Sequence, residues 1–146
     1  RHVESAPMLH RSPLEVISTG YMLIDGGKPT TATYISNTLP IPRNKEDIAL
    51  CTALAGELLG LKTIFMDAGS GANRTISPDM IAKVSQNIQV PLVVGGGIDS
   101  AEKAKALARA GADVIVVGNA IERDTNLIKE ISVSIKSMAN EPHRNL

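Results

Sequence analysis

The sequence predicts an α/β protein in which repeated βα units build a parallel sheet. Short apolar runs alternate with longer amphipathic segments along the 146 residues, and this alternation is typical of such repeats. Three of the short runs are almost wholly apolar, as expected for parallel strands that are covered on both faces. Two of these runs are followed by glycine, which allows the backbone to approach a ligand closely.

Four strands are expected, at 15–24, 63–67, 91–94 and 114–117. The connection that follows the first strand, 25–37, is long for a βα unit. Loops on this side of a sheet are where α/β enzymes usually place substrate contacts. A surface excursion with glycine turns would have the same composition, so both interpretations stay open.

Four helices are expected, at 45–59, 78–87, 101–110 and 125–139. Each is preceded by a side chain that can accept a hydrogen bond from the first helical turn, namely Asn44, Ser77, Asp99 and Asp124. Gly60 and Gly111 follow two of the helices, at positions where a left-handed residue commonly ends the element.

The composition excludes several classes of function. The chain carries 15 basic and 15 acidic side chains, so its formal net charge is zero, and it has no Trp, one Phe and two Tyr. Nucleic-acid-binding proteins usually have a basic surplus and stacking aromatic side chains. No apolar run reaches the roughly 18 residues that a membrane span needs. We therefore expect no nucleic-acid partner and at most peripheral membrane contact.

The cysteine content and the length predict a single intracellular domain. Cys51 stands alone, so no disulfide can form within the chain, and a cytoplasmic location is favoured. We expect Cys51 to be a small buried side chain. The length suits one domain, placed at 1–139, with a flexible tail at 140–146. Because the first residues begin inside an element, we expect the sequence to be part of something longer.

The segment 91–100 combines an apolar strand, three glycines and a helix start. Such a turn directs several backbone N–H groups at one point, where the helix dipole adds positive potential, and this arrangement suits a phosphate. A shorter form of the pattern follows at the next strand. In (β/α)8 barrels the phosphate commonly lies on the loops after the last two strands. We therefore expect Gly96 and Gly97 to share a phosphate with Gly118 and Asn119.

The second strand ends in Asp67, which is followed by the small residues Gly69, Ser70 and Gly71. A carboxylate in this place can accept a hydrogen bond from a substrate hydroxyl or act as a base. It can equally cap the turn that follows the strand. The two glycine-ended strands that come later in the chain favour the functional interpretation.

Other chemical motifs are weak. The glycine turn does not match the G-x-G-x-x-G pattern of dinucleotide-binding folds, and the sequence contains no nucleotide P-loop motif. His2, His10 and His143 lie near the chain ends without metal-ligand spacing, so we expect no metal site in this chain. Lys103 follows the glycine turn, but we expect it on a solvated helix face.

Three motifs together resemble the geranylgeranylglyceryl phosphate synthase family. They are Met66-Asp67-Ala68-Gly69-Ser70-Gly71-Ala72, then Val94-Gly95-Gly96-Gly97-Ile98, and Gly118-Asn119. The stretches 19–27 and 34–38 are similar to the second group of that family, which occurs in bacteria and archaea. The combination is specific, whereas any single motif is not.

The resemblance implies a TIM-type (β/α)8 barrel enzyme that joins sn-glycerol 1-phosphate to geranylgeranyl diphosphate, or a similar prenyl diphosphate, with the help of Mg²⁺. It implies substrate-binding roles for Phe65, Met66, Asp67, Ala68, Gly69, Ser70 and Gly71 at the glycerol part, and for Gly96, Gly97, Gly118 and Asn119 at the phosphate. Asp67 would contact the glycerol hydroxyls and assist deprotonation, and Tyr21 would line the prenyl cleft. Many relatives carry Tyr and Glu in place of Phe65 and Asp67, so this chain has a shorter carboxylate and lacks that phenol.

The length departs from the family, because such a barrel has eight strands and four are predicted here. We therefore expect the C-terminal half of a barrel, with the magnesium ligands in the absent N-terminal half. Half a barrel leaves two unpaired strand edges and an uncovered apolar face, so we expect pairing with an N-terminal half-barrel or a second copy, as a homo-oligomer. Two alternatives stay open: another phosphate-binding TIM-barrel enzyme, or a catalytically incomplete, self-associating half-barrel fragment.

Overall fold

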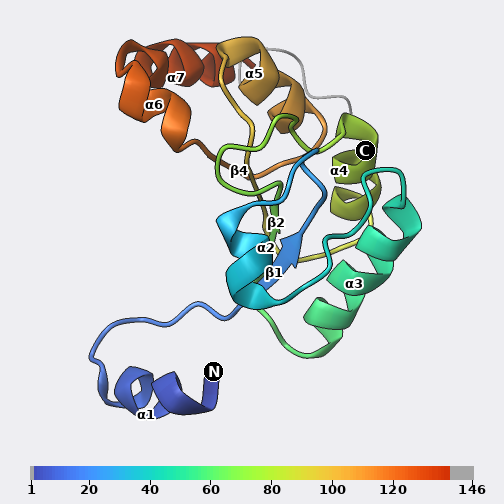
Figure 1. The fold of residues 1–146 in the computed structure, drawn as a ribbon, viewed down its shortest axis with the longest axis vertical. Helices are drawn as coiled ribbons and strands as arrows, with labels where there is room; N and C mark the ends of the chain where they lie inside the picture. Colours follow the sequence, from blue (N-terminus) through green and yellow to red (C-terminus); the bar gives the residue numbers. More distant parts are fainter. Residues whose placement is uncertain (1, 139–146) are drawn as a thin grey trace.

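A computed structural model describes residues 2–138 of the chain. The strands form one parallel sheet and are β1 (Thr19–Leu23), β2 (Thr63–Asp67), β3 (Leu92–Gly95) and β4 (Val114–Val116). The main helices, shown in Figure 1, are α3 (Glu46–Leu58), α4 (Pro78–Ser85), α5 (Ala101–Arg109) and α7 (Asn126–Met138). The predicted α/β class with a parallel sheet is confirmed, while the predicted tail at 140–146 lies outside the described residues.

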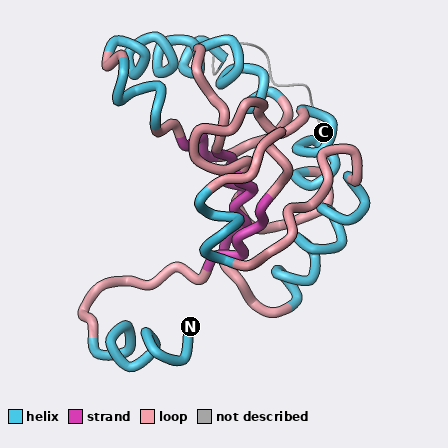
Figure 2. The backbone as a smooth tube through the Cα atoms, in the orientation of Figure 1, coloured by secondary structure: helices cyan, strands magenta, loops and turns pink. Residues whose placement is uncertain are grey.

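The order of the strands in the sheet is the order of the chain, β1-β2-β3-β4. Each connection therefore moves the chain one strand further in the same direction, and Figure 2 shows the strands side by side at the centre of the molecule. A doubly wound sheet reverses its strand order at a switch point, whereas barrel strands follow one another around an axis. The four βα units thus have the topology of part of a (β/α)8 barrel.

Three further helices were not predicted: α1 (His2–Arg11), α2 (Thr31–Ser36) and α6 (Asn119–Arg123). The helices α2 and α6 are too short to show helical periodicity, and α1 stands apart at the end of an extended segment (Figure 1). β1 is shorter than predicted because its ladder with β2 begins at Thr19, opposite Thr63. Within residues 2–138, no helix has both the length and the apolar character needed to cross a membrane.

Two helix starts are capped by serine. Ser77 caps α4 as predicted, and its hydroxyl oxygen accepts from the Met80 amide at 3.4 Å. The predicted cap of α5 was wrong, because Ser100 rather than Asp99 accepts from the Lys103 amide, at 3.3 Å. Ser100 directly precedes the first helical residue, where a short side chain reaches the third amide. Asp99 instead forms an ion pair with the Lys103 ammonium, at 2.7 Å.

The other predicted boundaries are partly confirmed. Lys45 occupies the cap position of α3 without a capping hydrogen bond from its side chain, so the prediction of Asn44 was wrong by one residue. The Asp124 carboxylate accepts from the Asn126 amide at 3.0 Å, at the start of α7. The predicted left-handed helix stops are found at Gly60 and Gly111.

The two faces of the sheet differ in burial. The helix-covered face carries side chains that are at most 3% exposed, namely Met22, Ile64, Met66, Leu92 and Val94. The edge strands β1 and β4 also carry side chains that remain 42–49% exposed, namely Tyr21, Val114 and Val116. Parallel sheets are normally covered on both faces, so the second face of this sheet has room for a partner. Cys51, which we predicted to be buried, is exposed.

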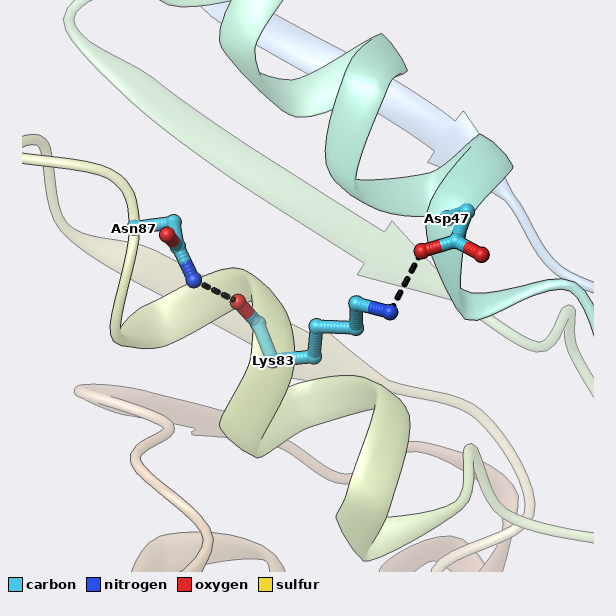
Figure 3. A network of polar contacts seen from close by, with 3 residues as sticks. All are labelled: Asp47, Lys83 and Asn87. Atoms are coloured by element: carbon cyan, nitrogen blue, oxygen red, sulfur yellow. Dashed lines mark hydrogen bonds and ion pairs between the residues drawn. The ribbon is translucent and has the colours of Figure 1, made fainter.

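A surface contact joins α3 to α4, as Figure 3 shows. Lys83 forms an ion pair with Asp47, and the Asn87 side-chain amide donates to the Lys83 carbonyl at 2.8 Å. The hydrogen bond from Lys83 and its charge lower the pKa of Asp47, and the same hydrogen bond raises the pKa of Lys83. Because both groups are in water, the pair adds little stability, and what it adds is lost as pH falls through the lowered pKa of Asp47.

Truncating matched valines tests the difference between the two faces. Val94→Ala should lower the free energy of unfolding by about 2 kcal/mol, because it removes two fully buried methyl groups and leaves a cavity. Val116→Ala should cost less than about 1 kcal/mol, because this side chain is 42% exposed. Urea unfolding measures both values. An equal loss would show that a second polypeptide or a second copy covers Val116 in solution.

Candidate functional site

A cavity of about 250 Å³ opens at the carboxyl ends of β2, β3 and β4. Most of the predicted substrate-binding residues line it, namely Phe65, Asp67, Gly69, Ser70, Gly71, Gly96, Gly97, Gly118 and Asn119. The carboxyl ends of neighbouring parallel strands meet at one edge of a sheet, which is where ligands of α/β proteins bind. The structure therefore brings the two glycine turns and Asp67 to one hollow.

The side chains of Met66 and Ala68, which we also predicted to bind substrate, lie elsewhere. Met66 is fully buried and Ala68 is 2% exposed, both within the hydrophobic core, and neither lines the cavity. Successive residues of a strand point to opposite faces. Phe65 and Asp67 therefore face the cavity, while Met66 points to the other face of the sheet and packs in the hydrophobic core.

The turn after β3 packs directly on the turn after β2. Gly96 has φ +88°, and a Cβ atom there would lie 2.8 Å from the amide nitrogens of Ala68 and Gly69. Gly97 has φ +70°, and its Cβ would lie 2.7 Å from the Arg74 carbonyl oxygen. Any side chain at these positions would push the two turns apart, so the cavity depends on glycine in both places.

Four of the residues that line the cavity have backbone amides that the turns and loops of the described chain do not use. Among the backbone hydrogen bonds of turns and loops in the described residues, none has the amide of Gly96, Gly97, Gly118 or Asn119 as its donor. A concave surface of unpaired amides attracts anions without the help of a basic side chain. The cavity can therefore bind a phosphate through main-chain groups alone.

Side-chain contacts connect the loops that surround the cavity. The Ser70 hydroxyl donates to the Asn119 side-chain oxygen at 2.9 Å, which joins the turn after β2 to the start of α6. A Cβ atom on Gly69 would lie 2.6 Å from the side chain of Thr30. The long connection after β1 therefore reaches the border of the site just before α2, which the sequence left open.

Asp67 is held by two hydrogen bonds. Its Oδ1 accepts from the Gly69 amide at 2.8 Å, and its Oδ2 accepts from the Tyr21 hydroxyl at 2.5 Å. The rings of Tyr21 and Phe65 meet edge to face, with centroids 5.4 Å apart. Burial, the hydrogen bond to Asp67 and the charge of Asp67 raise the pKa of Tyr21, so its phenol stays protonated and donates. The carboxylate of this cavity-lining residue is thus held in one orientation.

Sequence reasoning missed two charged residues that line the cavity, Asp99 and Arg123. Asp99 was assigned to a helix cap, whereas its carboxylate pairs with Lys103 and the residue lines the cavity. Arg123 ends α6, and its Nε donates to the Asn119 carbonyl at 3.2 Å. The spacing of Arg123 from Asn119 could have predicted its place, because a residue four positions further along a helix lies on the same side of that helix.

The described residues place no three His, Cys, Asp or Glu side chains close enough together to hold a metal ion. Asp67 and Asp99 line the cavity, but two carboxylates do not make the six-oxygen shell that Mg²⁺ prefers unless water and substrate complete it. We therefore assign no chemical step to a metal held by these residues.

Known proteins are similar to this chain in sequence and in fold. The profile of the PcrB family matches residues 4–135. A geranylgeranylglyceryl phosphate synthase of Chitinophaga pinensis is 60% identical over 139 residues, which are 95% of this chain and 55% of that protein. Its counterpart in Spirosoma linguale is 52% identical over 136 residues, which are 93% of this chain and 55% of that protein.

A solved structure that is similar to this chain has the same enzyme name as these relatives. It is (S)-3-O-geranylgeranylglyceryl phosphate synthase from Thermoplasma acidophilum in complex with its substrate sn-glycerol-1-phosphate, with a TM-score of 0.86 and 37% identity. The match covers 92% of this chain and 55% of that one. The chain thus spans about half the length of the relatives that it matches.

Asp67→Asn should lower the pKa of Tyr21, because it removes the negative charge beside the phenol and weakens the hydrogen bond that favours the neutral form. The burial of Tyr21 remains, so its pKa should stay above the ordinary value of 10.0. Carbon-13 NMR of labelled tyrosine, in a Tyr34→Phe background, isolates this titration. An unchanged pKa would contradict the contact between Tyr21 and Asp67.

The same shift predicts how stability depends on pH. The neutral phenol is favoured in the folded state, so its contribution is fully present below the ordinary tyrosine pKa of 10.0 and is lost as pH rises through the raised pKa. Tyr21→Phe should remove the fall in stability at alkaline pH that comes from ionisation of this phenol. Thermal unfolding at several pH values measures the difference. Identical alkaline profiles would exclude the contribution.

Proposed function

The chain belongs to the PcrB family, and we propose that it forms the phosphate-binding half of an enzyme that joins sn-glycerol 1-phosphate to a prenyl diphosphate. The product would be an ether-lipid precursor. The observation that carries the proposal is the cavity at the ends of β2, β3 and β4, where unused amides and one oriented carboxylate line the same hollow. The names of the relatives and the substrate bound to the T. acidophilum enzyme support it.

The phosphate of sn-glycerol 1-phosphate is proposed to lie between the two glycine turns. The amides of Gly96 and Gly97 would donate to it from one side, and those of Gly118 and Asn119 from the other. Backbone donors of this kind bind an anion without a change in their own position, because Gly96 and Gly97 are packed against the loop after β2 and Ser70 holds the side chain of Asn119. The phosphate would thereby fix the place of the glycerol.

The glycerol is proposed to extend from the phosphate toward Asp67, along the segment 65–71. Asp67 would accept hydrogen bonds from the glycerol hydroxyls and remove the proton from the one that reacts. The hydroxyl oxygen would form a bond to C1 of the prenyl diphosphate, the bond from C1 to the diphosphate oxygen would break, and the diphosphate would leave with the electron pair. Anchoring the phosphate removes translational freedom from this step.

The prenyl chain is proposed to contact Tyr21. This side chain is 49% exposed and meets Phe65 edge to face, so an aromatic surface adjoins the carboxylate that would hold the glycerol. Apolar contacts there would place C1 of the prenyl diphosphate near the reacting hydroxyl. The same phenol orients Asp67, so we propose that Tyr21 serves both substrates.

A second half-barrel is proposed to complete the site. The partly open sheet face, with Val114 and Val116 exposed, supports either an N-terminal half-barrel or a second copy of this chain in that place, as a homo-oligomer. We propose that the magnesium ligands lie in this other half. When bound, Mg²⁺ would neutralise the diphosphate that leaves.

Gly118→Ala tests the phosphate site with one added methyl group. A Cβ atom on Gly118 meets no protein atom within 4 Å, so the methyl group has room beside the cavity. We expect affinity for sn-glycerol 1-phosphate to fall roughly ten-fold, because one contact to a charged group is disturbed. Isothermal titration calorimetry measures the affinity, and thermal unfolding checks that the variant is folded at the temperature of the titration.

Gly60→Ala is the matched control. It also adds one methyl group with no neighbour within 4 Å, but Gly60 has φ +82° and lies outside the cavity lining. This variant should lose about 1 kcal/mol of stability and keep its affinity. Equal affinity in Gly118→Ala and the unmodified chain would remove Gly118 from the phosphate site.

Asp67→Asn separates recognition of glycerol from recognition of phosphate. The variant should keep its affinity for inorganic phosphate, because the amides are untouched. It should bind sn-glycerol 1-phosphate about ten-fold more weakly, because a charged acceptor for the hydroxyls is lost. Competition calorimetry with both ligands gives the ratio of affinities. A ratio equal to that of the unmodified chain would exclude contact between Asp67 and the glycerol.

Release of diphosphate tests the reaction itself. The chain, together with the half-barrel that completes it, is given geranylgeranyl diphosphate and Mg²⁺ with either sn-glycerol 1-phosphate or a triose phosphate. Release that requires sn-glycerol 1-phosphate supports the proposed transfer. Tight binding of the triose phosphate without any release would favour another phosphate-binding enzyme.

A further inference from the structure

We propose that Arg123 is a further phosphate-binding residue, whose guanidinium adds a charged contact to the anion held by the backbone amides. This inference rests on the proposed function, because it assumes that a phosphate monoester occupies the cavity between the glycine turns. The positive charge of Arg123 would make the site prefer doubly charged phosphate esters. Neutral backbone amides alone would give only a weak preference of this kind.

The position of Arg123 supports the contact. It lines the cavity together with Gly118 and Asn119. Its Nε donates to the Asn119 carbonyl at 3.2 Å, so the guanidinium is tethered beside the residue whose amide is proposed to bind the phosphate. The tether uses one of five N–H donors, and the remaining donors are left for a ligand.

The charges around Arg123 leave it available. Asp99 lines the same cavity, but its carboxylate is paired with Lys103 at 2.7 Å. On the other side, Arg123 borders a second hollow that contains Glu102, Asp124 and Glu130. Within residues 2–138, none of these carboxylates forms an ion pair with Arg123. Its positive charge is therefore not neutralised by the described part of the chain.

The chemistry suits a phosphate. A guanidinium is planar and always charged, and it presents paired N–H groups that match two phosphate oxygens. Arg123 is exposed at the rim of the cavity, so its attraction for the anion is screened by salt. The amide contacts, which carry no net charge, depend less on salt. The contribution of Arg123 is therefore distinguishable from theirs by ionic strength.

The test measures the affinity of the chain for sn-glycerol 1-phosphate by calorimetry at low and high salt. Arg123→Gln should weaken binding roughly ten-fold at low salt, and the loss should shrink as salt is added. Arg123→Lys should recover part of the affinity, because it keeps the charge but loses the paired geometry. Lys129→Gln is the matched control, since it removes the same charge from an exposed position of α7 that lies outside the cavity lining.

Each outcome has one meaning. Weaker binding in Arg123→Gln, with unchanged binding in Lys129→Gln, supports the contact. Equal loss in both variants shows a general charge effect and overturns it. Affinity in Arg123→Gln equal to that of the unmodified chain also overturns it, and leaves the amide site standing. If the unmodified chain does not bind sn-glycerol 1-phosphate at all, the proposed function fails together with the role of Arg123.

Discussion

The site depends on the close approach of two backbone turns. The turn after β3 lies against the turn after β2 at distances that no Cβ atom at Gly96 would permit, since the amide nitrogens of Ala68 and Gly69 would be 2.8 Å away. This contact sets the separation of β2 and β3 at their carboxyl ends and brings Gly97 over Arg74. Among the turn and loop hydrogen bonds of residues 2–138, the amides of Gly96 and Gly97 donate to no backbone carbonyl. A compact anion is the ligand that such a surface stabilises most.

The two carboxylates that line the cavity have different partners. Asp67 is held by the Gly69 amide and by the Tyr21 hydroxyl, which orients the carboxylate and keeps the phenol protonated. Asp99 instead forms an ion pair with Lys103. Within residues 2–138, Asp67 is therefore the cavity carboxylate whose charge no ion pair offsets.

Much of the fold followed from local patterns. The strand at 63–67 was predicted to the residue, because an apolar run that is buried on both sides leaves a clear signal. The helices α2 and α6 were missed because one or two turns carry too few residues to show a period. Ser100 displaced Asp99 as the cap of α5, since both side chains can accept a hydrogen bond and only the local backbone decides which one does.

The sequence by itself determined the glycine-ended strands and the carboxylate at the end of β2, because strand, turn and cap preferences act between near neighbours in the chain. Only the tertiary structure decided that Tyr21 donates to Asp67 and that Arg123 borders the cavity, because these contacts join residues brought together by strand order and helix position. It also decided that Met66 faces the core, since the direction of a strand residue depends on which face the helices cover.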